Sequence, residues 1–320
     1  MMSQPSFSIV IPTYNDAGFL RAAVDSVQAQ TFRNWEAIIV NNFSEDDTVS
    51  LIKSYGDRRI RLVNFANNGI IGAARNYGIS LATAPFVAFL DSDDVWYPNK
   101  LQRCWEKLVE GYDLVCHSEV WAYPQSMVRA VNYGPVHLAT YENLLFEGNC
   151  ISTSAVTVRR ERLERVGGFS TQPEFVTAED YDLWLKLARD ETKIAFLDEL
   201  LGDYRIHYES QSRIGVRNFN AVLSVFQHHM ATLTPPPPGK RVRRREAFIF
   251  YSGARQLQNS GRFVAAWPYF LQSVIRFPLE PRFYASMLLN ALCLSPDIFI
   301  RFGLNGRGAN ESKRKIIGRF

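Results

Sequence analysis

The sequence predicts an α/β fold in which a mixed, mostly parallel sheet is flanked by helices and followed by a helical C-terminal extension. Short apolar runs rich in β-branched residues alternate with amphipathic segments through residue 91, as in chains that build parallel sheets. Polar segments follow several of these runs, at the strand ends where such sheets hold their ligands. From Lys240 onward the chain becomes strongly basic and loses the alternation.

The first strand and helix set the pattern for the N-terminal half. Residues 7–12 (FSIVIP) predict a strand, and residues 17–30 predict a helix because Leu20, Val24 and Val27 fall on one helical face. Further strands are expected at 35–40 (WEAIIV), 60–65 (IRLVNF) and 86–91 (FVAFLD), with helices near 46–55 and 70–82 between them. We therefore expect mostly parallel strands with helices on both faces of the sheet.

Length and charge predict the domain organisation. A chain of 320 residues is long enough for about two domains. Prolines occupy residues 235–238, and from Lys240 to the end there are 15 Lys and Arg residues against 4 Asp and Glu residues. We predict a first domain over residues 1–234, a Pro-rich and basic linker over 235–245, and a helical, basic region over 246–320.

The basic C-terminal region allows two interpretations. Its longest apolar stretch, residues 283–300, is interrupted by Asn290, Pro296 and Asp297 and is too short to span a membrane. Flanking arginines and nearby Trp267 would suit a helix that lies in the interface of an anionic membrane. A buried helix of a small bundle with a solvated basic face fits the same pattern.

Composition and missing motifs exclude several classes of protein. Neither G-x-G-x-x-G nor G-x-x-x-x-G-K-[ST] follows a predicted strand, which excludes dinucleotide enzymes and P-loop ATPases. Basic and aromatic residues do not interleave in a recognition motif, so nucleic acid is excluded as a partner. The cysteines lack the close pairs of a zinc site or a disulfide scaffold, and the N-terminus does not resemble a signal peptide. We expect a cytoplasmic protein, with the inner face of the cell membrane as the alternative location.

An acidic cluster follows the fourth predicted strand. Asp91, Asp93 and Asp94 lie close together in FLDSDD and would repel one another unless a divalent cation held them. Mn²⁺ or Mg²⁺ suits such oxygen ligands and commonly bridges to a substrate phosphate. Asp and Ser are also common in turns, so the cluster by itself predicts either a metal site or a turn.

Five segments in a fixed order carry a family resemblance. They are VIPTYN at 10–15, the Asn-rich loop from Asn41 to Thr48, GAARNYGI at 72–79, FLDSDD at 89–94 and AEDYDLWLKLA at 178–188. Over roughly residues 6–210 the chain resembles the family 2 nucleotide-sugar glycosyltransferases of the GT-A fold. The resemblance implies transfer of a sugar from a nucleotide-diphosphate donor to a hydroxyl of a glycan or polyprenyl-linked acceptor, as in bacterial surface polysaccharide synthesis.

The resemblance also implies roles for residues that bind the donor. Thr13 and Tyr14 would flank the nucleobase and ribose, and Arg75 would reach the nucleotide. Asp91 would contact the ribose or the metal, and Asp93 would bind the metal that bridges the donor diphosphate. The cation would stabilise charge that develops on the leaving nucleoside diphosphate, so the enzyme is expected to be metal dependent.

The base and two further ligands come from the later segments. Asp180 is the candidate base that takes the proton of the acceptor hydroxyl. A single base implies direct displacement at the anomeric carbon, so we predict inversion. In YRIH, the resemblance makes Arg205 a phosphate partner and His207 a metal ligand. The structural alternatives are that Asp180 only complements a helix dipole and that His207 is structural.

One segment departs from the family pattern. The family usually has Asp-Asp-Gly-Ser where this chain has Asn41, Asn42, Phe43 and Ser44. An Asn amide offers one donor and one acceptor and can pair with uracil, whereas the adjacent donors of guanine suit a carboxylate better. Thymine offers the same groups as uracil, so we expect Asn41 and Asn42 to bind a uridine or thymidine donor, with a UDP-sugar as the preferred choice. The same departure motivates the alternative of a non-catalytic nucleotide-sugar-binding or scaffold protein with a degenerate site.

Overall fold

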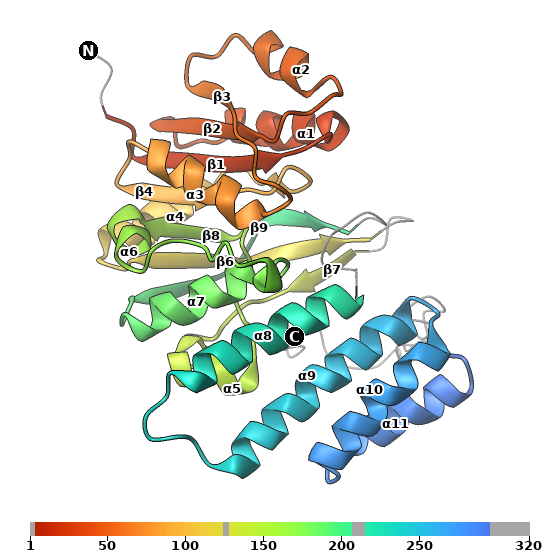
Figure 1. Cartoon of the computed structure of the whole chain (residues 1–320). Helices are drawn as coiled ribbons and strands as arrows, with labels where there is room; N and C mark the ends of the chain where they lie inside the picture. Colours follow the sequence, from red (N-terminus) through yellow and green to blue (C-terminus); the bar gives the residue numbers. More distant parts are fainter. Residues whose placement is uncertain (1–3, 124–127, 207–214, 295–320) are drawn as a thin grey trace, which may run out of the picture. The chain divides into compact units, whose positions relative to one another are not determined.

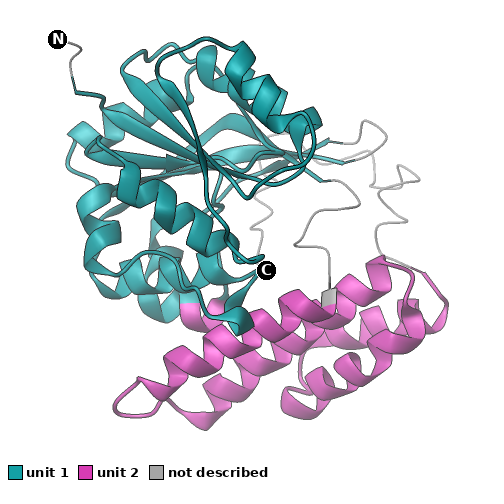
Figure 2. Ribbon diagram, turned by 45° about the horizontal axis from the view of Figure 1, so that its top comes forward, with its two compact units in different colours: residues 1–144, 148–207, 316–319 teal, residues 145–147, 208–315, 320 magenta. Residues whose placement is uncertain are grey.

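The computed structural model describes residues 4–123, 128–206 and 215–294 (Figure 1). The chain divides into two compact units (Figure 2). Of the described residues, unit 1 takes 4–144 and 148–206, and unit 2 takes 145–147 and 215–294. Unit 1 contains the whole sheet, and unit 2 is helical.

The predicted alternation of strand and helix is confirmed in the first part of unit 1. The elements are β1 (Phe7–Thr13), α1 (Ala17–Gln28), β2 (Trp35–Asn41), α2 (Thr48–Ser54), β3 (Ile60–Asn64), α3 (Ile71–Leu81) and β4 (Phe86–Phe89). Strands β1, β2 and β4 are buried along their whole length apart from Glu36. Such continuous apolar runs are typical of parallel strands that helices cover on both faces.

The second part of unit 1 is less regular than the first. It contains β5 (Val95–Trp96), α4 (Lys100–Val109), β6 (Leu114–Ala122), β7 (Val128–Val131), α5 (Tyr141–Glu147), β8 (Val156–Arg159), α6 (Arg160–Arg165), α7 (Glu179–Arg189) and β9 (Ile194–Arg205). Two short 3₁₀ turns, η2 (Val136–Ala139) and η3 (Pro173–Phe175), lie between these elements. The last three residues of α5 are assigned to unit 2.

The sheet order positions the ends of the strands. Along the sheet the order is β3-β2-β1-β4-β8-β6-β9-β5, and β7 pairs with β6. The pairs β1–β2, β2–β3, β1–β4 and β6–β9 are parallel, whereas β8 is antiparallel to both β4 and β6. Strand β6 therefore runs in the same direction as β4. The carboxyl ends of β1, β2, β4, β6 and β9 all lie along one edge of the sheet (Figure 1).

Side chains of β1 alternate between two helical layers. Ile9 and Ile11 join the hydrophobic core formed with α1 and α4, to which Val24 and Leu101 contribute. Val10 points to the other face, where α3 approaches so closely that a Cβ on Gly78 would lie 2.4 Å from a Val10 methyl carbon. Glycine at this position of α3 lets the helix pack directly on the strand.

Unit 2 is built from four described helices. They are α8 (Gly215–Ala231), α9 (Gly239–Asn259), α10 (Phe263–Arg276) and α11 (Pro281–Ala291). A small core that includes Leu257 and Phe270 holds α9 and α10 together, and a positive φ at Gly261 turns the chain between them. None of the described helices is long and apolar enough to cross a membrane.

The division between the units differs from the predicted boundary at residue 235. Helix α8 belongs to unit 2, because it packs on α9, where a Cβ on Gly253 would lie 2.9 Å from the Phe219 ring. The basic part of the predicted linker is the first turns of α9 rather than an extended segment. Lysine and arginine are good helix formers. Within unit 2, Arg244 forms an ion pair with Glu147 at 2.7 Å.

Candidate functional site

The loops that follow β1 and β2 hold each other in place. Asn15 has a positive φ, and its side-chain oxygen accepts a hydrogen bond from the backbone N–H of Glu45 at 2.7 Å. The backbone N–H of Asn15 donates to the Ser44 hydroxyl at 2.9 Å. Tyr14 and Phe43 project from these loops and are 57% and 58% exposed. The edge of the sheet thus presents two aromatic side chains to solvent.

Thr13 and Tyr14, predicted to flank the nucleobase and ribose, lie at this edge but differ in burial. The Thr13 hydroxyl is buried and makes no hydrogen bond to the described residues. Tyr14 is the more accessible of the two. Of this pair, only Tyr14 offers a side-chain surface on which a base could stack.

Asn41 and Asn42 occupy different environments. Asn41 is buried; its amide donates to the Asn64 oxygen at 2.8 Å, and its oxygen accepts from the backbone N–H and the hydroxyl of Ser44. The oxygen needed for bidentate pairing with uracil is therefore already used within the loop. Asn42 is half-buried, and its oxygen accepts from the backbone N–H of Asn67 at 3.0 Å. The Asn42 amide N–H groups could donate to a carbonyl acceptor of a base.

Arg75, predicted to reach the nucleotide, is buried and paired with two carboxylates. One guanidinium nitrogen donates to Asp91 at 2.7 Å and another donates to Glu179 at 2.8 Å, and the Arg75 side chain is only 4% exposed. Burial lowers the pKa of Arg75, but the charges of Asp91 and Glu179 outweigh burial and leave the pKa raised. Arg75 therefore ties the acidic loop after β4 to the first turn of α7.

The role of Glu179 could not be inferred from the sequence. Its second carboxylate oxygen accepts from the backbone N–H of Thr177 at 2.8 Å, where Thr177 has a positive φ. The only sequence signal was its place in the acidic segment before α7. Glu179 fixes the turn that precedes Asp180.

The acidic cluster forms a closed turn at the end of β4. The backbone N–H of Asp94 donates to the Asp91 carbonyl at 3.1 Å, and the backbone N–H of Asp91 donates to the Ser154 hydroxyl at 3.1 Å. Asp91 and Asp93 are both partly buried, whereas Asp94 is fully buried. Asp91 and Asp93 are thus the carboxylates of the turn that a bound ligand could reach.

Asp94 connects the acidic loop to the end of β9. One oxygen accepts from the backbone N–H of Arg205 at 2.9 Å, and the other has no hydrogen-bond partner among the described residues. Burial, followed by the charges of Asp93 and Glu119, raises the pKa of Asp94 well above its usual range. Burial likewise raises the pKa of Glu119, which accepts from the Tyr133 hydroxyl at 2.8 Å, to about 7. Both carboxyl groups are buried, and Asp94 ties the acidic loop to the end of β9 through the Arg205 backbone.

A buried lysine lies behind the acidic loop. The Lys100 ammonium donates to the Thr157 hydroxyl at 2.8 Å and lies 3.8 Å from the centroid of the Trp96 ring. The Trp96 indole N–H donates to the Ser154 carbonyl at 2.7 Å. Lys100 has no exposed surface, and burial lowers its pKa to about 8. Lys100 forms no ion pair among the described residues.

Asp180 lies in the first turn of α7, beside Glu179. One oxygen accepts from the Thr153 hydroxyl at 3.2 Å and the other from its neighbouring backbone N–H, that of Tyr181, at 2.7 Å. Burial and the negative charge of Glu179 raise the pKa of Asp180 to about 6, although Arg75 lowers it. A carboxylate with a pKa near neutrality can accept a proton at physiological pH.

Arg205 and His207 were both predicted from the YRIH segment at residues 204–207. The described contact of Arg205 uses its backbone N–H, which donates to Asp94. Its side chain is partly buried at the end of β9. His207 lies outside the described residues.

Comparison with known proteins identifies the family. Residues 8–159 match the family described as Glycosyl transferase family 2. A relative from Escherichia coli, "UDP-Glc:alpha-D-GlcNAc-diphosphoundecaprenol beta-1,3-glucosyltransferase WfgD", is 32% identical over 214 residues, which cover 66% of this chain and 80% of that protein. The chain belongs to glycosyltransferase family 2.

This chain spans only part of the length of several other relatives. An uncharacterized glycosyltransferase of Rickettsia felis is 31% identical over 244 residues, covering 71% of this chain but 39% of that protein. Across five Rickettsia relatives, the chain spans 31 to 64% of their length.

A solved structure confirms the GT-A fold. The mannosyltransferase PcManGT from Pyrobaculum calidifontis, solved in complex with GDP-Man and Mn²⁺, is 18% identical and superposes with a TM-score of 0.61. The likeness covers 94% of this chain and 88% of that chain. It supports the predicted family 2 architecture of a mixed sheet with helices on both faces.

The acidic loop can supply part of a metal site of the family 2 type. Among the described residues, no cluster of three or more His, Cys, Asp or Glu side chains is arranged to hold a metal ion by itself. Mg²⁺ and similar ions are commonly held by one or two carboxylates together with substrate phosphates and water. Asp91 and Asp93 fit this donor set, since Arg75 bonds one oxygen of Asp91 and the Asp91 side chain remains 26% exposed.

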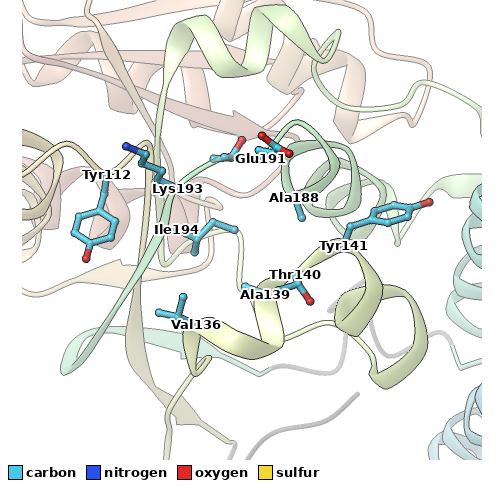
Figure 3. Close-up of a pocket in the computed structure, with 10 residues that line it drawn as sticks. Tyr112, Val136, Ala139, Thr140, Tyr141, Ala188, Glu191, Lys193 and Ile194 are labelled. Atoms are coloured by element: carbon cyan, nitrogen blue, oxygen red, sulfur yellow. The ribbon is translucent and has the colours of Figure 1, made fainter.

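A separate cavity of about 420 Å³ lies between residues of unit 1 (Figure 3). Its lining includes Tyr112, which precedes β6, and Lys193 and Ile194 at the start of β9. Because β6 and β9 run parallel to β4, their first residues lie away from the acidic loop. The cavity therefore does not belong to the candidate donor site.

Proposed function

We propose that this protein is an inverting, metal-dependent glycosyltransferase that transfers a sugar from a UDP-sugar to a hydroxyl of a lipid-linked or glycan acceptor. The observation that carries the proposal is the Asp91–Arg75–Glu179 bridge, with hydrogen bonds of 2.7 and 2.8 Å. The bridge holds the acidic loop close to the first turn of α7, which carries Asp180. A diphosphate-binding loop beside a carboxylate base is the arrangement that direct displacement needs.

Asp180 acts as the base in this proposal. Its carboxylate takes the proton of the acceptor hydroxyl while the acceptor oxygen attacks the anomeric carbon and the bond to the nucleoside diphosphate breaks. The Thr153 hydroxyl and the Tyr181 backbone N–H orient the carboxylate. Because the acceptor oxygen displaces the nucleoside diphosphate directly, the configuration at the anomeric carbon inverts.

Asp93, with Asp91, would hold Mn²⁺ or Mg²⁺ against the donor diphosphate. A bound cation offsets the charge on the leaving group, as Lewis-acid catalysis requires. The Mn²⁺ in the PcManGT complex supports this choice of metal. Arg75 bonds one oxygen of Asp91, and the other oxygen is the one proposed to bind the cation.

A UDP-sugar is the donor that we propose. Tyr14 and Phe43 offer exposed rings on which a uracil could stack, and the Asn42 amide can donate to a carbonyl oxygen of the base. Asn41 then acts by fixing the loop through Ser44 and Asn64 rather than by touching the base. The name of WfgD gives UDP-Glc as its donor and a diphosphoundecaprenol-linked sugar as its acceptor. It supports both the proposed UDP-sugar donor and the proposed lipid-linked acceptor.

Binding and hydrolysis of donors test the proposal without knowledge of the acceptor. We expect a UDP-sugar to bind only with Mn²⁺ or Mg²⁺, as measured by calorimetry, and Asp93→Asn to abolish binding. Asp180→Asn should retain binding but lower turnover by about 100-fold or more. Glu174→Gln, which changes an exposed carboxylate of unit 1, should alter neither quantity.

The pH dependence and stereochemistry complete the test. Because Asp180 must be deprotonated to act, turnover should rise with pH through about 6. The anomeric proton coupling of the product should show inversion. Binding without turnover in the wild-type protein under every metal condition would favour the non-catalytic scaffold, and preferential use of GDP-sugars would overturn the choice of donor.

A further inference from the structure

Helices α10 and α11 of unit 2 each expose large apolar side chains. Seven such residues are between 47 and 85% exposed: Val264, Leu271 and Ile275 on α10, Leu279 after it, Tyr284 and Leu288 on α11, and Leu292 at its end. On α10 the spacing of seven and four residues places the three side chains on one helical face. On α11 a spacing of four does the same. We call these seven residues the α10–α11 face.

The α10–α11 face is not needed to hold unit 2 together. The same helices bury a different set of side chains in the core of the unit, among them Ala266 and Phe270 on α10 and Phe283 on α11. Polar groups complete the packing on that side, where the Asn290 amide donates to the Phe263 carbonyl at 2.9 Å. The α10–α11 face is therefore an apolar surface in addition to the buried side of the helices, and such exposed surfaces are typical of interaction sites.

Charge distinguishes between the partners that an apolar face could have. From Lys240 to Leu294, unit 2 has nine Lys and Arg residues against two Asp and Glu residues. In a symmetric dimer, unit 2 of a second copy would bring the same positive charge to this face, and residues 295–320 of this chain carry six Lys and Arg against two Asp and Glu. Both would be repelled, whereas an anionic lipid surface attracts each basic residue by about 1 kcal/mol.

The ends of the helices suit a membrane interface. Arg262 precedes α10 and is exposed, and Arg282 in the first turn of α11 is 62% exposed, although it pairs with Glu280. Tyr284 on the face presents a ring and a hydroxyl that donates to the Pro278 carbonyl at 2.9 Å. Apolar side chains with basic residues at their borders and an amphipathic aromatic ring are typical of helices that lie in the headgroup region.

We propose that the α10–α11 face docks unit 2 on an anionic lipid bilayer, with the two helices lying in the interface. The inference rests on the proposed function only for the class of acceptor: a lipid-linked acceptor would be found at the same surface. The apolar side chains enter the headgroup boundary, and the arginines remain at the level of the lipid phosphates.

The test compares two triple variants of the full chain. Leu271→Ser, Ile275→Ser and Leu288→Ser together change the face and leave the buried side untouched. Val109→Ser, Val128→Ser and Val136→Ser change three exposed valines of unit 1 and serve as the matched control. Co-sedimentation is measured with vesicles of phosphatidylglycerol and phosphatidylcholine, and with vesicles of phosphatidylcholine alone.

We expect the wild-type chain and the control variant to bind the anionic vesicles and not the neutral ones. The face variant should partition at least about tenfold more weakly, because three large side chains no longer enter the interface. Equal binding by wild type and face variant would overturn the proposal, as would a wild-type chain that does not bind anionic vesicles. A concentration-dependent dimer that only the face variant loses, measured by light scattering, would assign the face to a second copy instead.

Hydrolysis of UDP-sugar without vesicles separates this inference from the proposed function. The wild-type chain and the face variant should hydrolyse the donor at the same rate. Hydrolysis of the donor without vesicle binding would refute only the docking proposal. Vesicle binding without donor binding would refute only the proposed function.

Discussion

Replacing Lys100 by methionine should stabilise unit 1 at neutral pH. The folded state holds the pKa of Lys100 at about 8, against an ordinary value of 10.5. Between these values the unfolded chain binds more protons, so the lysine lowers the free energy of unfolding below pH 8, and this cost disappears as pH rises through 10.5. The difference in pKa corresponds to about 3 kcal/mol at pH 7.

The net gain must also allow for a lost hydrogen bond. Methionine has similar length but leaves the Thr157 hydroxyl without the ammonium at 2.8 Å, which costs about 1 kcal/mol. We therefore expect Lys100→Met to raise the free energy of unfolding by about 2 kcal/mol at pH 7. The gain should fall by about 2 kcal/mol between pH 7 and pH 9.5, because the wild-type lysine is then increasingly neutral.

Urea unfolding followed by tryptophan fluorescence measures this difference. Five of the six tryptophans lie in unit 1, so the signal reports mainly on its unfolding. Lys53→Met, which changes an exposed lysine of α2, is the control and should give a difference that does not vary with pH. A Lys100→Met variant that is less stable than wild type at pH 7 would refute the reasoning. It would mean that the Trp96 ring, 3.8 Å from the ammonium, stabilises the buried cation more than burial destabilises it.

Three further substitutions test other parts of unit 1. Arg75→Met should lower the free energy of unfolding by about 3 to 5 kcal/mol, because it leaves the Glu179 carboxylate buried without its cation. A loss below about 1 kcal/mol in urea unfolding would show that the bridge is not buried as described. Gly78→Ala should cost about 1 to 3 kcal/mol, because its Cβ would meet a methyl carbon of β1 at 2.4 Å. Gly18→Ala, in open space on α1, should instead be neutral or stabilising; urea unfolding measures both glycine variants. Asn41→Asp should lower the free energy of unfolding by about 1 to 3 kcal/mol at pH 7, since it replaces the amide donor to Asn64 by a second acceptor. This loss should shrink below pH 4 as the new carboxyl group protonates. An equal loss at both pH values would exclude the hydrogen bond to Asn64 as its cause.

The elements of the first half could be predicted because their patterns are local. The buried strands β1 and β2 are short apolar runs, and α1 repeats its apolar residues with helical spacing. The two-residue strand β5 carries no such pattern, and it forms only because β9 provides its partner. The first turns of α9 looked like a linker because of their charge, yet arginine favours helix when one face of the segment packs.

The site residues divide in the same way. The family motifs located the acidic loop and Asp180, but the bond between Arg75 and Glu179 joins residues 104 positions apart and depends on the tertiary fold. The position of Asn41 was predicted correctly at the end of β2, whereas its partner was not. In the parallel register Asn41 is opposite Asn64 on β3, so the two amides pair with each other before a ligand arrives.

The sheet order also determines when the acidic loop can form during synthesis of the chain. Val95 pairs with Asp203, and Asp94 accepts from the backbone N–H of Arg205, so the loop is closed by a strand that leaves the ribosome more than a hundred residues later. The family match ends at Arg159, before β9. A nascent chain that ends at Arg159 would leave the edge of β6 uncovered, because β9 is not yet made. An uncovered strand edge can pair with the wrong strand. Translation must therefore reach the end of β9 before the loop can be completed.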